Sequence, residues 1–321
     1  MILQCAMNVM KTVLITGGTG MAGMNLTNML LQNNYRVIVM SRNPPVTSKH
    51  PKLLYAKWDV EKQQIDMDAL ALADAIIHLA GAGVADKRWS AKRKLAIQQS
   101  RTESSALLVK ALQNMNAGKV QIIISASAIG WYGPDNTESK INGFIETAPP
   151  SKDFLGETCR LWEESITPVS NMGIRLVKYR IGIVLSNTGG ALKAFRQPLR
   201  GGIAAILGSG SQMVSWIHVD DLCRLFMFAL ENNSVNGVYN AVGNHPVSNK
   251  KLTITLAQIQ RGKWFIPVYV PSFLLKIVMG EMSIEVLKST TVNNTKIRTA
   301  GFTFLYPEIQ HALQNLKDSE E

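Results

Sequence analysis

Apolar and polar positions follow an alternating pattern of strands and helices through the first two-thirds of the chain. Short β-branched apolar runs, typical of buried parallel strands, are separated by longer segments in which apolar residues recur at helical spacing. The expected strands cover residues 13–16, 36–40, 75–80, 120–125 and 175–179. This order predicts an α/β protein with a Rossmann-type doubly wound parallel sheet.

The alternation stops at a glycine-rich stretch, residues 201–210. The chain then returns through an apolar segment, 215–221, into a helix that is expected to end near Glu231. Beyond Gly243 the pattern becomes irregular, with short helices separated by prolines. We therefore predict a Rossmann domain formed by residues 10–180 and 212–245, and a smaller, mainly C-terminal substrate-side domain formed by 181–211 and 246–321.

A glycine-rich turn follows the first predicted strand and precedes a helix expected over about 25–32. Gly17 and its neighbours would permit positive backbone dihedral angles and a close approach of the main chain to a pyrophosphate, while the helix N-terminus faces the phosphates. The second strand follows at the spacing of a βαβ unit. The turn therefore predicts a dinucleotide site, contacted by Gly17, Gly18, Thr19, Gly20, Met21, Ala22 and Gly23.

The end of the second strand indicates which dinucleotide is bound. An NAD site usually has a carboxylate there, which accepts hydrogen bonds from the ribose. This chain has Ser41 and Arg42 instead, and no acid follows before Asp59. A guanidinium beside a hydroxyl suits a 2′-phosphate, so NADP is preferred over NAD and the Rossmann domain is predicted to bind NADP. The alternative is that Arg42 is a solvated loop residue.

Composition excludes several other classes of protein. The chain has 321 residues with 46% hydrophobic content, enough for a large core, and no uninterrupted apolar run of about 18 residues. No membrane span is therefore predicted, and 273–279 is expected to be a helix packed at a domain edge.

The N-terminus lacks the basic region of a signal peptide, so we expect a cytoplasmic protein, with Met7 and Met10 as alternative starts. Three scattered cysteines, including Cys5, indicate reduced thiols and no metal site.

The net charge of +11 does not by itself indicate nucleic-acid binding. The basic residues are spread along the chain, and no RNA- or DNA-binding motif is present, so no nucleic-acid partner is predicted. One basic run, 87–94, precedes a helix that is expected to continue to Lys110. It is either a solvated helix start or a region that attracts an anionic substrate or cofactor.

Several motifs in one order resemble an extended short-chain dehydrogenase/reductase of the NAD-dependent epimerase/dehydratase type. The glycine turn matches that family's nucleotide turn, and Trp216 to Asp221 matches its return strand and helix start. The resemblance implies that Asp59 contacts adenine and that the segment from His78 lies along the cofactor. It places the active-site serine at Ser127. The other implied cofactor contacts are Leu79, Ala80, Gly81 and Ser125.

A narrower set of runs is similar to an atypical subfamily sometimes labelled as cell-division-inhibitor-like. These runs lie at 100–102, 127–133, 154–163, 182–186, 189–192 and 300–304. The label is a weak guide to activity because fold and function separate easily.

The chain departs from the larger family at its acid/base pair. That family has a tyrosine followed four residues later by a lysine, whose ammonium lowers the phenol pKa and holds the ribose. No tyrosine here has a lysine at that spacing. The helix expected to carry the pair, 153–164, has Leu155 and Cys159 at the two positions. Either another residue supplies the proton or the protein binds the dinucleotide without the usual chemistry.

Two residues are the candidates for catalysis. Ser127 is expected at the carboxyl end of a central strand, facing the cofactor crevice. Tyr132 is the first candidate for the proton donor, with Lys152 and Glu157 behind it. The alternative for Tyr132 is a packed aromatic residue whose hydroxyl reaches solvent.

The segment before the return strand also departs from the family. Many nucleotide-sugar enzymes have an arginine for the diphosphate there, whereas this chain has the sequence Gly-Ser-Gln-Met-Val-Ser over 210–215. Gln212 and Ser215 would either bind a neutral polar ligand or satisfy loop backbone. His218 is expected to be structural.

The sequence therefore favours an NADP-dependent oxidoreductase acting on a carbonyl or hydroxyl group of an unidentified small molecule. The alternative is an NADP(H)-binding regulatory or redox-sensing protein, and a third interpretation is an NAD-dependent nucleotide-sugar epimerase or dehydratase. A homodimer is common in this fold, but nothing in the sequence identifies its interface.

Overall fold

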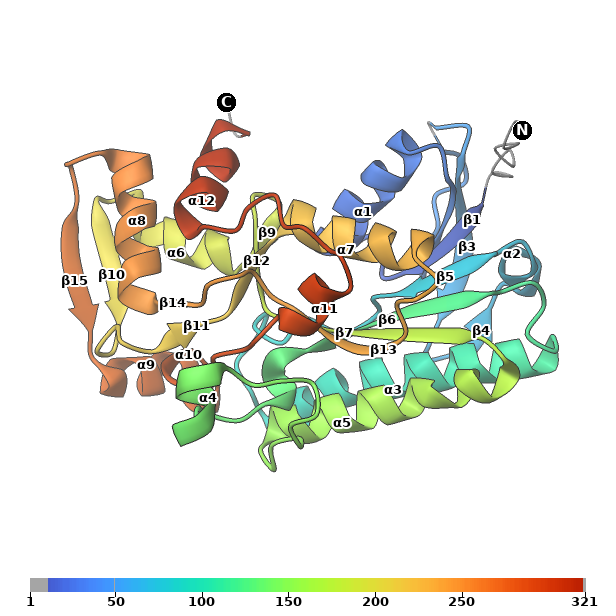
Figure 1. The fold of residues 1–321 in the computed structure, drawn as a ribbon, viewed down its shortest axis with the longest axis horizontal. Helices are drawn as coiled ribbons and strands as arrows, with labels where there is room; N and C mark the ends of the chain where they lie inside the picture. The colour runs from blue at the N-terminus through green and yellow to red at the C-terminus, as the bar shows by residue number, and fades with distance from the viewer. Residues whose placement is uncertain (1–10, 49, 320–321) are drawn as a thin grey trace.

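The computed structural model describes residues 11–48 and 50–319. The alternative starts at Met7 and Met10, and Cys5, lie outside the described residues. The described chain forms one large, mainly parallel sheet covered by helices on both faces, with a second group of small sheets and helices beside it (Figure 1). This confirms the predicted α/β fold of the Rossmann type.

The large sheet has the strand order β13-β7-β6-β5-β1-β2-β3-β4. All neighbouring strands pair in parallel except β3 and β4, which are antiparallel. The order changes direction at β1, which is the switch point where such sheets bind ligands. The strands are β1 (Thr12–Thr16), β2 (Arg36–Ser41), β3 (Leu53–Asp59), β4 (Gln64–Ile65), β5 (Ala75–His78), β6 (Ile122–Ala128), β7 (Arg175–Ile181) and β13 (Gly237–Ala241).

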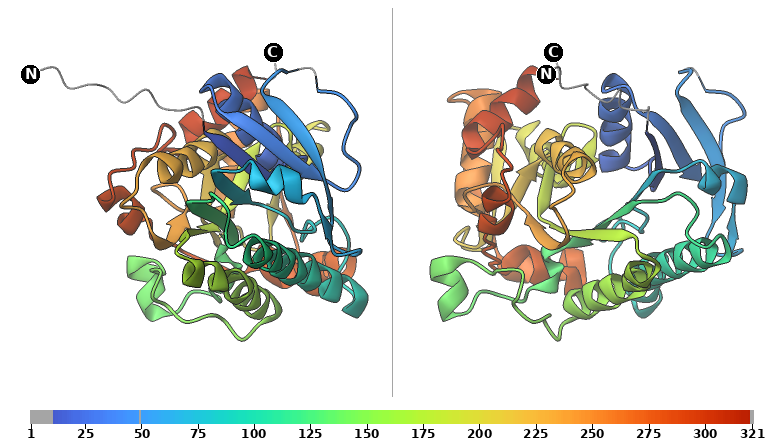
Figure 2. Two further views of the ribbon diagram at one scale, coloured as in Figure 1. Left: turned by 90° about the vertical axis from the view of Figure 1, so that its right-hand side faces the viewer. Right: turned by 45° about the vertical axis from the view of Figure 1, so that its right-hand side comes forward.

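Helices cover each face of this sheet. The helices α1 (Met21–Gln32) and α7 (Val219–Glu231) lie on one face, and α3 (Ala91–Asn114) and α5 (Phe154–Ile166) lie on the other, side by side in both views of Figure 2. Successive side chains of β1 point to opposite faces of the sheet. Val13 and Ile15 belong to the core under α1, whereas Leu14 packs toward α3. A strand buried on both sides needs apolar side chains on both faces, which explains the consecutive apolar residues 13–15.

The expected elements are present, with shifted ends. The structure adds β3, whose alternating exposed and buried residues did not stand out as an apolar run. Helix α1 begins at Met21, directly after the glycine turn, and not near residue 25. Strand β5 ends at His78, whereas β6 and β7 each extend past the expected end. The shifts of β6 and β7 matter because their added residues carry candidate chemistry.

The remaining elements lie in or next to a second apolar core beside the large sheet. Its buried residues include Leu192, Trp216, Leu256 and Leu313. The elements are β8 (Ile183–Ser186), β9 (Gly189–Gly190), α6 (Ala191–Leu199), β10 (Ile203–Leu207), β11 (Met213–Val214), β12 (Trp216–His218), β14 (Val247–Ser248), α8 (Asn249–Arg261), β15 (Ile266–Val270), α9 (Ser272–Met279), α10 (Ser283–Leu287) and α12 (Ile309–Asp318).

The strand β12 pairs with β8 and not with the large sheet.

Short helical elements complete the described chain. They are α2 (Met67–Ala71), η1 (Ile129–Trp131), α4 (Thr137–Asn142), η2 (Thr167–Met172), η3 (Gly280–Met282) and α11 (Thr295–Thr299).

The apolar segment near residue 273 forms a helix, as expected, and few of its side chains are buried. In α9 only Leu275 is buried, whereas the side chains of Phe273, Ile277 and Val278 are exposed. The helix is short, and within the described part of the chain no helix is long and apolar enough to cross a membrane.

Candidate functional site

The glycine turn between β1 and α1 is tightly packed against the end of β5. Gly17 has φ +72°, and a Cβ at this position would lie 2.8 Å from the carbonyl carbon of Leu79. A Cβ at Gly23 would collide with the carbonyl oxygen of Gly17. The chain therefore needs glycine at both positions, and the turn presents bare backbone.

The N-terminus of α1 has unused hydrogen-bond donors. Gly20 caps the helix without a side-chain hydrogen bond, and the first turn holds no acidic residue. Within the described chain the N–H groups of Met21, Ala22 and Gly23 make no intrahelical bond, while that of Met24 bonds to the Gly20 carbonyl. A phosphate group fits this end of the helix because it would accept hydrogen bonds from these donors and lie at the positive end of the helix dipole.

Two cations lie at the end of β2. Arg42 follows Ser41 and is exposed, while Lys57 on the neighbouring strand β3 pairs in register with Ser41. The Lys57 ammonium donates a hydrogen bond to the Arg42 carbonyl oxygen. Sequence reasoning missed Lys57 because the strand that carries it was not predicted. The pair makes this edge positive, which suits an additional phosphate.

The other predicted cofactor residues lie around this edge of the sheet. Asp59 ends β3 and accepts a hydrogen bond from the Lys62 amide at 3.1 Å. Leu79, Ala80 and Gly81 follow β5, where the amide of Leu79 donates to the Thr16 carbonyl and that of Ala80 to the Thr16 hydroxyl. The carboxyl ends of β1, β2, β3 and β5 thus lie at the same edge of the sheet.

His78 is a buried residue that supports the glycine turn through hydrogen bonds to neighbouring elements. Its Nδ1 lies 2.7 Å from the Thr16 hydroxyl and its Nε2 lies 3.1 Å from the Ser105 hydroxyl. Burial lowers the pKa of His78 to about 4, so the ring is neutral near pH 7. The residue therefore links β1, β5 and α3 without a charge.

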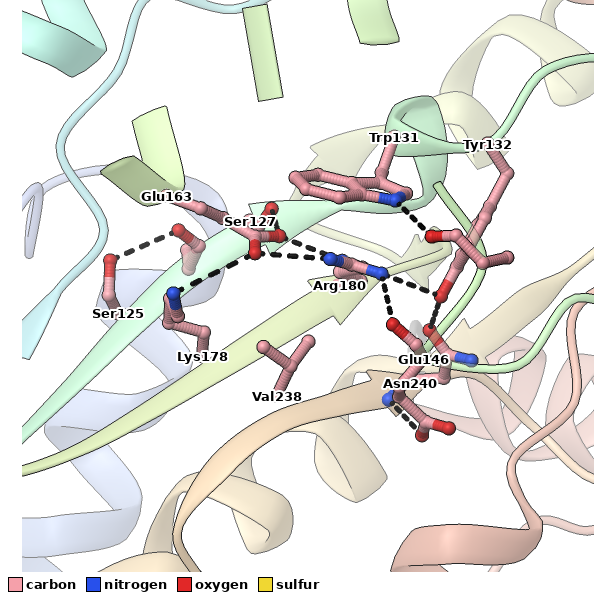
Figure 3. Close-up of polar contacts among 12 residues, drawn as sticks. Ser125, Ser127, Trp131, Tyr132, Glu146, Glu163, Lys178, Arg180, Val238 and Asn240 are labelled. Carbon is pink, nitrogen blue, oxygen red and sulfur yellow. Dashed lines mark hydrogen bonds and ion pairs between the residues drawn. The ribbon is translucent and has the colours of Figure 1, made fainter. Parts of the chain in front are cut away.

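A second group of polar residues crosses the carboxyl ends of three adjacent strands. Ser127 on β6, Arg180 on β7 and Asn240 on β13 pair in register, so their side chains share one row (Figure 3). The Ser127 hydroxyl donates to Glu163 Oε1 at 2.8 Å, and Glu163 lies on α5, which packs against one face of the sheet. We call Ser127, Tyr132, Glu163, Arg180 and Asn240 the strand-end cluster.

Arg180 is the centre of this cluster. Its Nε lies 2.8 Å from Glu163 Oε1, and its guanidinium carbon lies 3.6 Å from the centroid of the Trp131 ring. Its Nη1 donates to the Tyr132 hydroxyl and to the Glu146 carbonyl. Burial lowers the pKa of Arg180, but the hydrogen bonds and charge of Glu163 outweigh burial and raise it overall. The arginine is therefore a fixed cation, 2% exposed.

Tyr132 is completely buried, with its ring stacked on Phe144 at 5.0 Å. Its hydroxyl donates to Asn240 Oδ1 at 2.7 Å and accepts from Arg180 at 3.1 Å. Burial, against the opposing charge of Arg180, raises the pKa of Tyr132 to about 12. The hydroxyl therefore does not reach solvent, and its hydrogen bonds connect β13 to Arg180.

The two positions that the resemblance aligns with the family's acid/base pair, Leu155 and Cys159, lie at the start of α5. A Cβ at Gly130 would lie 3.1 Å from Leu155 Cβ and 3.6 Å from Cys159 Sγ, so both side chains face the end of β6. Burial raises the pKa of the Cys159 thiol to about 12, so it stays protonated. Neither side chain supplies a cation or a proton donor active near neutral pH.

The secondary candidates have other roles or lie apart from the cluster. Glu157 and Lys152 are exposed, and Glu157 pairs with Arg160 at 2.5 Å. Gln212 donates to the carbonyls of Leu207 and Val286, and Ser215 bonds the backbone near residue 290. The interpretation that these two residues satisfy loop backbone is confirmed.

His218 is structural, as expected. It caps α7, where its Nδ1 accepts a hydrogen bond from the Asp220 amide at 3.1 Å. Burial lowers its pKa to about 4.

No group of residues that could hold a metal ion occurs in the described part of the chain.

A cavity of about 410 Å³ adjoins the cluster in the connection between β6 and α5. Its lining includes Phe144, which stacks on Tyr132, and Ala148, whose carbonyl accepts a hydrogen bond from Trp131 Nε1. Asn136, Glu138 and Ser139 supply polar lining.

Sequence reasoning missed Glu163, Arg180 and Asn240 as site residues. The expected strand ended at residue 179, one residue before Arg180, so the arginine was left in a loop. A charged residue next to the end of an apolar strand was the available signal. Glu163 and Asn240 carried no such signal, because only the packing of α5 and β13 brings them to Ser127 and Arg180.

Comparisons with known proteins identify the families that the chain resembles. The profile of the NAD-dependent epimerase/dehydratase family matches residues 13–154 and 186–242, and a domain of unknown function, DUF1731, matches 270–316. An epimerase family protein of Staphylococcus saprophyticus is 34% identical over 307 residues, which cover 96% of this chain and 99% of the relative. One of Staphylococcus aureus is 33% identical over the same length.

Solved structures share the fold of this chain. The human epimerase family protein SDR39U1, determined with NADPH, superposes with a TM-score of 0.82 at 28% identity and covers 96% of this chain and 99% of its own. A nucleoside-diphosphate sugar epimerase from Corynebacterium glutamicum gives 0.75 at 29% identity, with 96% of this chain and 58% of that chain covered. A UDP-N-acetylglucosamine 4-epimerase from Bacillus cereus, at 17% identity, shares the fold.

Proposed function

Because the chain belongs to the NAD-dependent epimerase/dehydratase family, we propose that it is an NADP-dependent oxidoreductase of the extended short-chain dehydrogenase type. Its substrate would be a small molecule with a carbonyl or hydroxyl group. The observation that carries this proposal is the placement of Ser127, bonded to a buried carboxylate, on the same sheet edge as the glycine turn.

The cofactor half of the proposal rests on two features. The open N–H groups of α1 suit the pyrophosphate, and Arg42 with Lys57 suits a 2′-phosphate. The solved relative that superposes at 0.82 was determined with NADPH, in line with this preference. We further propose that Asp59 contacts adenine and that Leu79, Ala80, Gly81 and Ser125 lie along the dinucleotide.

The catalytic half assigns proton transfer to Ser127 and Glu163. A bound nicotinamide would supply or accept the hydride. In the oxidation direction, a substrate hydroxyl would give its proton to Ser127 Oγ as the serine proton passes to Glu163 Oε1; reduction reverses both transfers. The burial of Glu163 and Arg180 shields this relay from water, and the ion pair fixes its geometry.

Tyr132 remains the alternative proton donor, but its contacts favour a supporting role. Its hydroxyl already donates to Asn240 and accepts from Arg180, so it orients the arginine that holds Glu163. The regulatory alternative, an NADP(H)-binding protein without the usual chemistry, is favoured by one observation: Leu155 and the protonated thiol of Cys159 occupy the acid/base positions.

The first test is a titration with NADPH and NADH, followed by nucleotide fluorescence, in the wild type and in Arg42→Ala and Lys57→Ala. We expect selective NADPH binding, weakened roughly tenfold or more by each variant because one charge-assisted contact is lost. Arg36→Ala is the matched control, since Arg36 is exposed at the opposite end of the same strand. Equal affinity for both nucleotides would exclude the proposed preference.

The second test is Ser127→Ala in a screen of carbonyl compounds with NADPH consumption as readout. Loss of turnover with unchanged NADPH affinity is expected. Turnover that survives Ser127→Ala would remove the serine from the mechanism, whereas NADPH binding without any turnover in the wild type would favour the regulatory function.

A further inference from the structure

Arg101 on α3 lies directly against the segment that follows β5. A Cβ at Gly81 would lie 3.2 Å from the guanidinium carbon of Arg101. The Nη1 of Arg101 donates to the carbonyl of Ala82 at 3.0 Å and to that of Ile97 at 2.8 Å. The guanidinium is thus fixed beside a segment that the proposed function assigns to the cofactor.

The charge of Arg101 has no counter-ion in the described chain. No carboxylate there forms an ion pair with it, although the guanidinium carbon lies 4.9 Å from the centroid of the Trp162 ring. Its Nε and Nη2 donate no hydrogen bond to described residues, and neither is fully enclosed. Burial, together with the nearby charge of Arg93, lowers the pKa of Arg101, while Cys159 opposes this shift. Arg180, in contrast, has Glu163 within 2.8 Å.

The position of Arg101 relative to α5 indicates which group would accept hydrogen bonds from its Nε and Nη2. Trp162 and Cys159 lie one turn apart on α5, and Cys159 also faces Gly130 in η1, just after β6. Cys159 stands where the family has the lysine that holds a ribose. Arg101 therefore brings a cation from α3 to a place where α5 has lost one.

We propose that the Arg101 guanidinium replaces the missing lysine and donates hydrogen bonds to the ribose on the nicotinamide side of the dinucleotide. This inference rests on the proposed NADP binding. It makes Arg101 a cofactor-positioning residue, distinct from the 2′-phosphate contacts of Arg42 and Lys57.

Two probes separate the nicotinamide side from the adenine side. NADPH has both, whereas adenosine 2′,5′-bisphosphate lacks the nicotinamide and its ribose. We would measure the affinity of Arg101→Gln, Arg101→Met and Arg101→Lys for each probe, by fluorescence for NADPH and by calorimetry for the bisphosphate. Arg160→Gln is the matched control, because Arg160 is an α5 arginine in exposed ion pairs with Glu157 and Glu164.

We expect Arg101→Gln and Arg101→Met to weaken NADPH binding roughly tenfold or more while bisphosphate binding stays unchanged. Arg101→Lys should retain most of the NADPH affinity, and Arg160→Gln should change neither. Arg101→Met preserves packing on Trp162, and circular dichroism would verify that each variant is folded.

Two results would overturn the inference. The first is unchanged NADPH affinity in folded Arg101 variants, and the second is an equal loss for both probes, which indicates a general disturbance of the site. If the wild type bound neither NADPH nor the bisphosphate, the proposed function would fail and this inference with it. Wild-type binding with no effect of Arg101 would overturn the inference alone.

Discussion

The glycine turn and the strand-end cluster lie on the same edge of one sheet but are built in different ways. The turn uses backbone: Gly17 and Gly23 pack without side chains and leave N–H groups open at the start of α1. The cluster uses buried charge: Glu163 and Arg180 are 5% and 2% exposed and are satisfied by each other and by neighbouring polar groups. The first is a local structure, and the second joins four separate elements.

Because they are built differently, the two regions should differ in how well they tolerate amino-acid substitutions elsewhere in the chain. A backbone site depends on the shape of a short segment, so it remains recognisable when other parts of the chain change. A buried cluster depends on all of its members at once, because removing one partner leaves an unpaired charge. The chain has the glycine turn but no tyrosine followed four residues later by a lysine, and its Ser127 is bonded to the buried Glu163.

The largest expected effect is the loss of one buried charge. Arg180→Met should lower the free energy of unfolding by about 3–5 kcal/mol, since Glu163 would stay buried without its cation. Urea unfolding would measure this. The double variant Arg180→Met with Glu163→Leu should recover part of the loss, because no unpaired charge remains. A double variant that is less stable than Arg180→Met alone would show that the pair is not coupled in this way.

The region around the glycine turn should also respond to pH, through His78. Folding lowers the pKa of His78 from 6.5 to about 4, so the unfolded chain binds a proton first as pH falls. Stability from this residue is complete above about pH 6.5 and is lost as pH falls toward 4, by roughly 3 kcal/mol. His218 shifts in the same direction.

Urea unfolding at several pH values would test this dependence. His78→Gln should make the stability of the protein less sensitive to pH between 6.5 and 4, whereas His311→Gln, at an exposed position, should leave the dependence unchanged. Identical pH profiles for wild type and His78→Gln would contradict the assignment.

A methyl group in the turn should affect both stability and binding. Gly17→Ala places a Cβ against Leu79 at positive φ and should cost about 1–3 kcal/mol, with NADPH binding greatly weakened. Gly237→Ala is the matched control, because Gly237 has φ +84° but no atom within 4 Å of a built Cβ. Thermal unfolding and NADPH titration would compare them. Equal effects of the two variants would mean that positive φ, and not the contact with Leu79, sets the cost.

The smallest expected effect is the loss of the Tyr132 hydroxyl. Tyr132→Phe keeps the stacking on Phe144 but leaves the Asn240 amide oxygen without its donor, which should cost about 1–2 kcal/mol. Tyr35→Phe, at a half-exposed hydroxyl bonded to Glu231, should cost less. Unfolding in urea checks both, and a neutral Tyr132→Phe would show that the hydroxyl does not support the cluster.

The strand-and-helix order, the glycine turn and the serine at the end of β6 could be predicted from the sequence. Each of these depends on local properties: apolar β-branched runs form buried strands, and only glycine permits the packing at Gly17 and Gly23. These signals lie within short segments, so they can be read without knowledge of the fold.

The surroundings of Ser127 could not be predicted from the sequence, because they come from separate elements of the fold. Glu163, Arg180 and Asn240 come from α5, β7 and β13, and their meeting depends on strand register and on the packing of α5 over the sheet. The same holds for Arg101, whose free donors become visible once α3 and α5 are placed beside each other. Side-chain hydrogen bonds act over about 3 Å, so they depend on three-dimensional proximity that spacing along a chain does not specify.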